Sequence, residues 1–317
     1  MPNELRKDPL FERWALIAEA RGKRPTDFAV KHAGEKKQEG ICYFCPGNEH
    51  LTPPEISRIS EKGKWVIRCF PNKFPAVSRD SPNAYGYHEV IAETDKHGAS
   101  FSELSAGHIK KVLDMYASRL SALRRDREIK YVMIFKNEGE EGGASLSHSH
   151  TQVIALARVP PVIEDEIRAQ KDYKRAHRKC ALCELAKNEK TGPRFIYEND
   201  EFVCFAPFAS RFSFETWILP KKHLSCITQL SDKQKLALAH ALKSSLGKLD
   251  KLLNKPPYNY LVHIAPEARG REYGNFHFHI EICPRFGKWA GFEFGSGIVI
   301  NSMPPETAAR ALRETRV

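Results

Sequence analysis

The chain carries the same ordered set of residues twice, which requires a fold built from two similar halves. Each half has a Cys-x-x-Cys pair, two apolar runs, a single histidine, a helical pattern, another apolar run and a His-x-His motif. The second cysteine and the single histidine lie 52 residues apart in the first half and 40 in the second. From that histidine to the motif the intervals are 51 and 54 residues. This agreement in order and spacing indicates an internal duplication.

Each half is expected to form an α+β unit, because a strand meander with one helix needs both elements to bury its apolar faces. We expect two tandem repeats, each an antiparallel sheet with a packed helix, over residues 1–157 and 179–317. A helical connection over residues 158–178 is expected to join them. One helix, capped by Ser102 or Ser105, is predicted to run to about Arg125 with an apolar stripe on one face, and a second capped helical pattern spans about 231–253. At 317 residues the chain is long enough for two cores.

Composition narrows the class of protein. A hydrophobic fraction of 41% and a charged fraction of 28% are typical of a globular protein. No apolar run approaches the ~20 residues needed to span a bilayer, and no secretory segment is evident, so we expect a cytoplasmic protein without a membrane partner. The net charge of +11 could suit nucleic acid, but Lys and Arg are spread along the chain, and a phosphorylated small molecule explains a positive site equally well. We expect a small-molecule partner and no nucleic acid.

The cysteine pairs predict two metal sites. Zinc takes four ligands at tetrahedral corners, and a Cys-x-x-Cys turn supplies two thiolates. The other two ligands would be the histidines that follow each pair, giving the sets Cys42, Cys45, His97, His148 and Cys180, Cys183, His223, His277. Such closed sets are structural and leave no position for water. A redox pair or two buried thiols is the alternative for a single Cys-x-x-Cys motif.

The first His-x-His motif predicts a reactive histidine. Side chains alternate along a strand, so His148, His150 and Gln152 would point to one side. If His148 binds metal, His150 is free for chemistry and is held rigid by its neighbour. The small residues just before the motif are expected to leave backbone amides free to meet an anion. The alternative is a pair of surface histidines, or a metal pair, on a half-exposed strand.

Nearly the whole chain resembles the galactose-1-phosphate uridylyltransferase family, a branch of the histidine-triad superfamily built from two tandem repeats. The resemblance rests on a series of short motifs spread over both halves. They include Asp8-Pro9-Leu10 with Trp14, Arg21 and Arg24-Pro25, Cys42-x-x-Cys45-Pro46-Gly47-Asn48, Phe70-Pro71-Asn72-Lys73, Lys136-Asn137, Gly143-x-Ser145, His148-x-His150-x-Gln152 and Lys288-Trp289-Ala290-Gly291-Phe292-Glu293.

The resemblance implies a mechanism. His150 would attack the α-phosphorus of a nucleoside diphosphate sugar, expel hexose 1-phosphate and hold the nucleotidyl group for a second acceptor. Gln152 would stabilise the charge that builds on the phosphoryl oxygens. The other matching positions imply substrate contacts by Arg21, Arg24, Asn72, Asn137, Gly143, Ser145, Lys288 and Trp289. Lys288 and Trp289 match a segment that reaches the partner's site in the family dimer, so a homodimer is expected.

Two departures leave the substrate open. The motif here is His-Ser-His rather than the His-Pro-His of the better-known uridylyltransferases, and the second half keeps a cysteine pair that many of them lack. Both features resemble a plant branch that works as an ADP-glucose phosphorylase. The leading hypothesis is a UDP-glucose–hexose-1-phosphate uridylyltransferase. Its alternatives are adenylyl transfer to phosphate, hydrolysis, or a zinc-stapled nucleotide- or RNA-binding protein without turnover. His279 is expected to belong to a relict half that only scaffolds.

Overall fold

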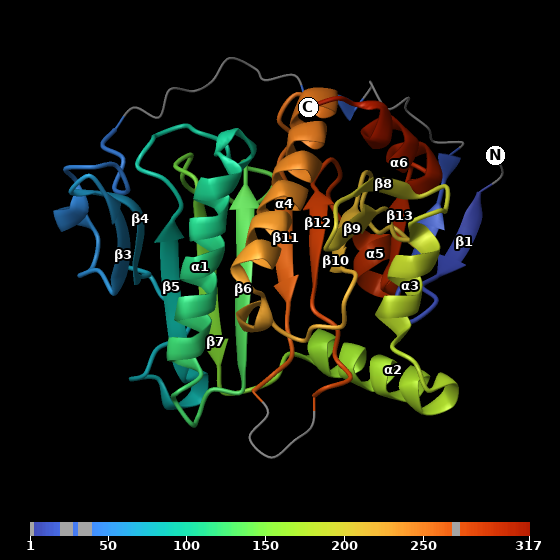
Figure 1. Cartoon of the computed structure of the whole chain (residues 1–317), viewed down its shortest axis with the longest axis horizontal. Coiled ribbons are helices and arrows are strands. Elements are labelled where there is room, and N and C mark those ends of the chain that lie inside the picture. The colour runs from blue at the N-terminus through green and yellow to red at the C-terminus, as the bar shows by residue number, and fades with distance from the viewer. Residues whose placement is uncertain (1–2, 20–27, 31–39, 268–272) are drawn as a thin grey trace.

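A ten-stranded antiparallel sheet forms the centre of the protein (Figure 1). This computed structural model describes residues 3–19, 28–30, 40–267 and 273–317. The strand order is β3-β4-β5-β7-β6-β11-β12-β10-β9-β8. The first five strands come from the first half of the chain and the last five from the second. The two half-sheets join where β6 (Tyr131–Glu138) pairs antiparallel with β11 (Tyr258–His263).

The two halves share one topology, which confirms the expected duplicated α+β fold. The order β3-β4-β5-β7-β6 of the first half is matched by β8-β9-β10-β12-β11 in the second. The remaining strands of the first half are β3 (Ser57–Glu61), β4 (Lys64–Pro71), β5 (Gly86–Ala92) and β7 (His150–Leu156). Those of the second half are β8 (Phe195–Glu198), β9 (Phe202–Phe205), β10 (Thr216–Pro220) and β12 (His279–Pro284).

One long helix from each half covers the same face of the sheet. These are α1 (Ala106–Leu123) and α4 (Asp232–Leu253), which lie side by side in Figure 1. Each begins at a serine whose hydroxyl accepts a backbone N–H, as the sequence predicted: Ser105 from His108 at 3.1 Å and Ser231 from Gln234 at 3.3 Å. Their apolar stripes are buried in the main hydrophobic core, and burial of apolar surface there stabilises the fold.

The connection and the termini form a smaller layer at one end. The connecting helix is α2 (Pro161–His177), followed by α3 (Ala181–Glu189). A separate three-stranded sheet holds β1 (Glu4–Lys7), β2 (Trp14–Ile17) and β13 (Ile298–Asn301), with β2 and β13 parallel. The other elements are α5 (Gly291–Ser296), α6 (Pro305–Glu314) and the short 3₁₀ turns η3 (Glu49–Leu51), η4 (Pro82–Ala84), η5 (Phe101–Glu103) and η6 (Ile227–Gln229).

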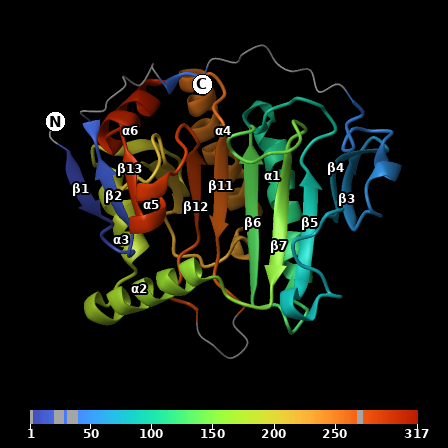
Figure 2. The ribbon, with the colours of Figure 1, turned by 180° about the vertical axis from the view of Figure 1, so that it is seen from behind.

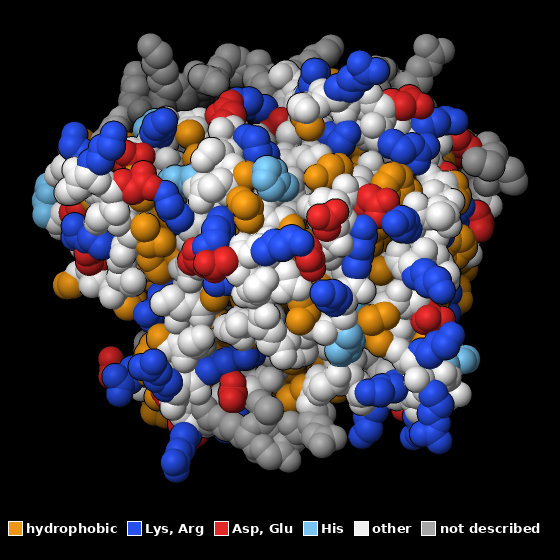
Figure 3. Space-filling view, in the orientation of Figure 1, with side chains coloured by type: hydrophobic (Ala, Val, Ile, Leu, Met, Phe, Trp, Pro, Cys, Tyr) orange, Lys and Arg blue, Asp and Glu red, His pale blue; other side chains and the backbone are white. Residues whose placement is uncertain are grey.

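The reverse face of the first half-sheet is open. In Figure 2 no helix of the described residues lies over the middle of β5, β7 and β6. The face with α1 and α4 carries Lys and Arg side chains intermixed with Asp and Glu rather than gathered in one patch (Figure 3). Among the described residues, none of the helices has the length and apolar character needed to cross a membrane. Within the described ranges, the face of β5, β7 and β6 opposite α1 is the one that no helix covers.

Candidate active site and metal clusters

His150 is the first residue of β7 and lines a pocket of about 300 Å³. Its side chain is on the face opposite Thr151, whose hydroxyl contacts Tyr116 of α1 at 2.5 Å, so the histidine points to the open side. The pocket walls are mostly apolar and aromatic, with a few polar groups; they comprise Tyr43, Phe44, Leu51, Thr52, Pro53, Phe70, Asn72, Lys73, Phe74, Val90, Ser145, Leu146 and Gln152. A pocket of this make-up suits a ligand with a flat ring and an anionic group.

The hydrogen bonds of His150 fix which nitrogen can react. Its Nδ1 lies 2.8 Å from the carbonyl oxygen of His148, and only an N–H can donate to that oxygen. The Nε2 atom therefore carries the lone pair. Burial, and then the nearby Lys136 ammonium, lower the pKa of His150, which favours the neutral ring. Phe44 packs edge-on against the imidazole, with ring centroids 5.4 Å apart. The arrangement favours a neutral, oriented imidazole with an unprotonated Nε2.

Gln152 is oriented by a histidine that sequence reasoning missed. The N–H of Ala76 donates to Nδ1 of His88 at 3.1 Å, so the proton of the neutral ring is on Nε2. That Nε2–H donates to Oε1 of Gln152 at 2.9 Å. Burial lowers the pKa of His88 and keeps it neutral. The carboxamide NH₂ of Gln152 is thus left for the pocket. A polar residue within the apolar run of β5 was the available signal for His88.

The loop between β6 and β7 approaches the neighbouring strands closely. Asn259 donates from Nδ2 to Oδ1 of Asn137 at 2.9 Å and to the carbonyl oxygen of Gly142 at 2.6 Å. A Cβ atom on Gly142 would lie 2.2 Å from the carbonyl oxygen of Glu138, so only glycine fits there. Asn137 therefore shapes this loop, and it does not line the His150 pocket.

The expectation of free amides before the motif is wrong for Gly143 and Ala144. The N–H of Gly143 donates to the carbonyl of Glu140 at 2.8 Å, and the N–H of Ala144 donates to that of Gly139 at 3.0 Å. These amides close the turn, in which Gly143 has a φ of +83°. Ser145, two residues further on, does line the pocket.

The other predicted substrate residues fall into three places. Asn72 lines the pocket, and its Oδ1 accepts the N–H of Phe74 at 2.9 Å. Lys288 and Trp289 instead line a separate hollow of about 420 Å³, formed mostly by residues of the second half, where the Trp289 ring stacks on Phe212 with centroids 5.8 Å apart. Within one chain they do not reach His150. Arg21 and Arg24 lie outside the described residues.

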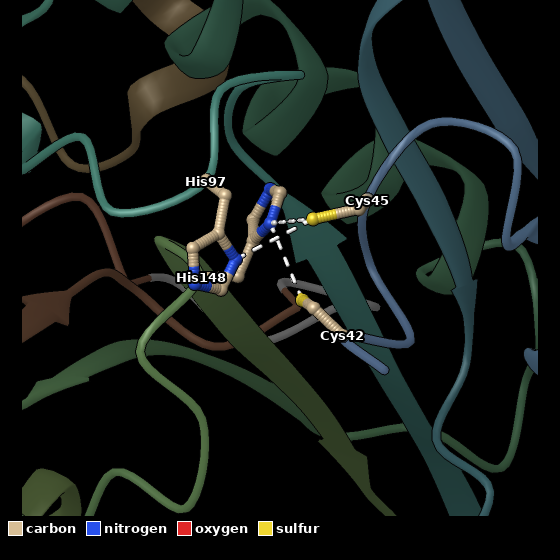
Figure 4. A group of neighbouring side chains, drawn as sticks. All are labelled: Cys42, Cys45, His97 and His148. Carbon is tan, nitrogen blue, oxygen red and sulfur yellow. Dashed lines mark hydrogen bonds between the residues drawn. The ribbon is translucent and has the colours of Figure 1, made fainter. Parts of the chain in front are cut away.

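The first predicted metal set converges in space (Figure 4). Cys42 and Cys45 come from the turn before η3, while His97 follows β5 and His148 precedes β7. Sγ of Cys42 and of Cys45 each lie 3.6 Å from Nδ1 of His148, and Cys45 lies 3.4 Å from Nδ1 of His97. Nε2 of His148 is 2.8 Å from the carbonyl oxygen of Thr94, so its proton is there and Nδ1 is free to bind a cation.

The second set occupies the equivalent places in the second half. Cys180 caps α3 and Cys183 lies in its first turn; both Sγ atoms are 3.4 Å from Nδ1 of His277. Nδ1 of His223 lies 3.9 Å from Sγ of Cys183. Both histidines direct Nε2 to backbone carbonyls, His277 to Pro220 at 3.1 Å and His223 to Gly274 at 2.8 Å.

These distances fit a tetrahedral ion. Zn–S bonds of about 2.3 Å and Zn–N bonds of about 2.0–2.1 Å place sulfur and nitrogen about 3.5 Å apart. The observed separations run from 3.4 to 3.9 Å. In each set the four ligand atoms lie within 4.8 Å of one another. Both clusters can therefore hold a metal ion with two thiolate and two imidazole ligands.

The second His-x-His motif has no comparable opening. His279 is fully buried, and its ring packs between Phe11, Trp217 and His263. Its neighbours Glu166 and Glu281 are both paired with Arg13, so guanidinium rather than a metal neutralises them. The geometry agrees with a second half that scaffolds rather than reacts.

A duplicated half-sheet with an oriented histidine beside a Cys₂His₂ cluster defines the two-repeat histidine-triad class of nucleotidyltransferases. Residues 80–160 match the family model "Galactose-1-phosphate uridyl transferase, N-terminal domain", and residues 166–287 match its C-terminal domain. The chain belongs to the galactose-1-phosphate uridyl transferase family.

Relatives with different activities match nearly the full chain. An ADP-glucose phosphorylase from Arabidopsis thaliana is 36% identical, covering 98% of this chain and 92% of the relative. A galactose-1-phosphate uridylyltransferase from Thermotoga maritima is 33% identical over 99% of both. The crystal structure of the Arabidopsis thaliana ADP-glucose phosphorylase with bound ADP-glucose superposes with a TM-score of 0.88, at 35% identity, covering 99% of this chain and 100% of that one. A uridylyltransferase structure gives 0.78 at 30% identity, covering 98% of each.

Proposed function

We propose that this protein moves a nucleoside monophosphate from a nucleotide sugar to a phosphate-bearing acceptor through a covalent intermediate on His150. Nε2 of His150 would attack the α-phosphorus, the bond to the β-phosphate oxygen would break, and hexose 1-phosphate would leave. The acceptor then takes the nucleotidyl group and frees the imidazole. The observation that carries the proposal is the donated Nδ1–H of His150, which leaves Nε2 unprotonated at the pocket.

The other pocket residues have matching roles. The carboxamide NH₂ of Gln152 would donate to the phosphoryl oxygens as charge builds on them. Asn72 and Ser145 are polar groups on the same walls. For Asn137 and Gly143 we propose that they hold the loop that carries Ser145. Arg21 and Arg24 remain proposed phosphate contacts on the resemblance alone.

Each Cys₂His₂ cluster is proposed to bind one structural zinc ion. Two thiolates and two imidazoles suit zinc, and four protein ligands leave no open position for a reacting water. In the first cluster, Tyr43 and Phe44 stand between the two cysteine ligands and also form a wall of the pocket. The first zinc would therefore hold that wall, as well as His148 beside the nucleophile.

Lys288 and Trp289 are proposed to act across a homodimer. They line a different hollow from the His150 pocket of their own chain, and both are exposed. Each subunit would be a two-repeat unit over residues 1–157 and 179–317 with the connection at 158–178.

For the donor we propose UDP-glucose with a hexose 1-phosphate acceptor. A second candidate is ADP-glucose with inorganic phosphate as acceptor. The similarity to the Arabidopsis thaliana phosphorylase, whose structure was solved with bound ADP-glucose, favours it, as do the two intact cysteine–histidine clusters. Both candidates use the same step on His150.

The test is trapping of the labelled protein. Purified protein incubated with UDP-glucose or ADP-glucose, each labelled in the α-phosphate, should retain label that is stable to base and lost in acid. His150→Ala should retain none, while His279→Ala should be labelled like the wild type if it folds. Acceptors galactose 1-phosphate and inorganic phosphate, added separately, identify the reaction. Binding of nucleotide without label in the wild type would contradict the proposal.

A further inference from the structure

A fully buried ion pair lies behind the strand that carries His150. Lys136 on β6 and Glu93, the residue after β5, have no exposed side-chain surface, and Nζ of Lys136 is 2.8 Å from Oε2 of Glu93. An isolated buried charge is strongly destabilising, so the Glu93 carboxylate needs the Lys136 ammonium. Lys136 also lies 3.2 Å from Oε2 of Glu138, which is partly exposed. Buried pairs are costly compared with an apolar core, which makes their location informative.

The ion pair makes hydrogen bonds to three consecutive residues, the proposed nucleophile His150 and the residue on each side of it. Ser149 donates its hydroxyl to Oε2 of Glu93 at 2.7 Å, and the Thr151 hydroxyl donates to Oε1 of the same carboxylate. Nζ of Lys136 donates to Oγ of Ser149 at 2.9 Å and to the carbonyl oxygen of His150 at 3.2 Å. Ser149, Thr151 and the carbonyl oxygen of His150 are therefore all hydrogen-bonded to the Lys136–Glu93 ion pair.

This attachment bears directly on the reacting atom. The ring of His150 is held by the backbone, through its bond to the carbonyl of His148. A shift or rotation of the backbone at residues 149–151 would therefore move Nε2 relative to a bound phosphate. Attack needs the reacting atoms at about 3–3.5 Å with aligned orbitals. A small displacement of the attacking nitrogen therefore slows the reaction strongly.

The second half lacks this attachment at its closed site. The residues that stand in place of Ser149 and Thr151 are Phe278 and Ile280, which have no hydroxyl. The two hydroxyls thus occur in the half whose histidine faces a pocket and are replaced by apolar side chains in the half whose histidine is buried.

We propose that Glu93 and Lys136, acting through the hydroxyls of Ser149 and Thr151, are positioning residues that set the reactive geometry of His150. They touch neither substrate nor the reacting nitrogen, and no proton or electron passes through them. The inference rests on the proposed role of His150 as the nucleophile.

The test distinguishes the effect of the Thr151 hydroxyl group from the effect of the size and shape of the Thr151 side chain. Thr151→Val keeps the shape and removes the hydroxyl, whereas Thr151→Ser keeps the hydroxyl and removes a methyl group. The measurement is the single-turnover rate of label transfer from UDP-glucose and ADP-glucose, together with the dissociation constant of each donor. We expect Thr151→Val to react roughly 10- to 100-fold more slowly with donor affinity little changed, and Thr151→Ser to react close to the wild-type rate.

Ser149→Ala is the independent second variant and should also slow the transfer. Its matched control is Ser210→Ala, which removes another buried hydroxyl, donated to the carbonyl of Pro207 at 2.8 Å, from the second half. Thr151→Val and Ser149→Ala leave Glu93 and Lys136 paired with each other, so both variants are expected to fold. The thermal midpoint of each variant checks this. Ser210→Ala should react at the wild-type rate.

The outcomes distinguish this inference from the proposed function. If the wild type is labelled, and Thr151→Val and Ser149→Ala are labelled equally fast, the positioning role is refuted while the function stands. A slow Thr151→Ser with a fast Thr151→Val would show that packing matters, and would also refute it. A wild type that never acquires label would overturn the proposed function and this inference with it.

Discussion

At His150, burial and the nearby Lys136 ammonium favour an imidazole that stays neutral in mild acid. The pKa of the free imidazole is about 6.5, and burial together with Lys136 lowers the pKa of His150 below that value. The neutral form therefore persists as the pH falls through about 6.5. We expect the single-turnover labelling rate to be flat from about pH 8 to 6.5 and to decline only at lower pH. A rate already halved at pH 6.5 or above would contradict the lowered pKa.

Gln152 permits a substitution that separates its two functional groups. Gln152→Glu keeps an oxygen to accept the Nε2–H of His88 but removes the amide donors. If those donors stabilise the phosphoryl charge, Gln152→Glu should be at least as slow as Gln152→Ala. Each is expected to lose roughly 10²–10³-fold in the labelling rate, with donor affinity changed far less for Ala. Pre-steady-state labelling checks this; near-normal rates for Gln152→Glu would exclude the role.

The sequence identifies candidate site residues that belong to a recognisable motif. It does not identify residues that strand pairing brings next to that motif. His150, Gln152 and all eight cluster residues stand at fixed spacings, and the structure brings each cluster together. His88, Glu93 and Lys136 belong to other strands and meet the motif only because β5 and β6 pair with β7. No local spacing encodes that adjacency. The sequence marks His88 only as a polar residue in an apolar run and Lys136 only as part of a short motif, without showing which residues they contact.

At the scale of elements, the two clusters should have separable effects. Cys180→Ser and Cys42→Ser are each expected to lower metal content from about two equivalents to about one, and to lower the thermal midpoint, because a closed site contributes folding energy. Cys42→Ser should also weaken donor binding, since Tyr43 and Phe44 form the pocket wall. Elemental analysis, thermal melting and donor titration measure the three quantities. Unchanged donor binding in a metal-depleted Cys42→Ser would contradict the link.

Helices and strands can be predicted from the sequence where the features that produce them lie close together in the chain. The helices over 106–123 and 232–253 could be predicted because their serine caps and apolar stripes are local features. The sheet that joins β2 to β13 could not, because its parallel pairing links residues nearly 300 positions apart and no turn signal connects them. The joining of the half-sheets at β6 and β11 is equally non-local.

For the whole molecule, the central question is which residues cover the His150 pocket on the side of the sheet without a helix. Figure 2 shows the half-sheet that carries His150 without a helix over it, and the pocket there contains Lys73 as a cation among largely apolar walls. Lys288 and Trp289 are displayed elsewhere on the same chain, beside the hollow that contains Phe212. In a symmetric dimer, one patch on each subunit can complete the other's site.

Complementation between variants tests this arrangement. His150→Ala lacks the nucleophile, and a chain with Lys288→Ala and Trp289→Ala lacks the reaching segment, so each homodimer should be nearly inactive. In a mixed dimer one of the two sites combines an intact His150 with an intact segment from the partner. Random reassembly of equal amounts should make about half of the dimers mixed, and so restore roughly a quarter of the wild-type activity. If the segment served its own chain, each mixed dimer would contain no complete site, and mixing would restore nothing.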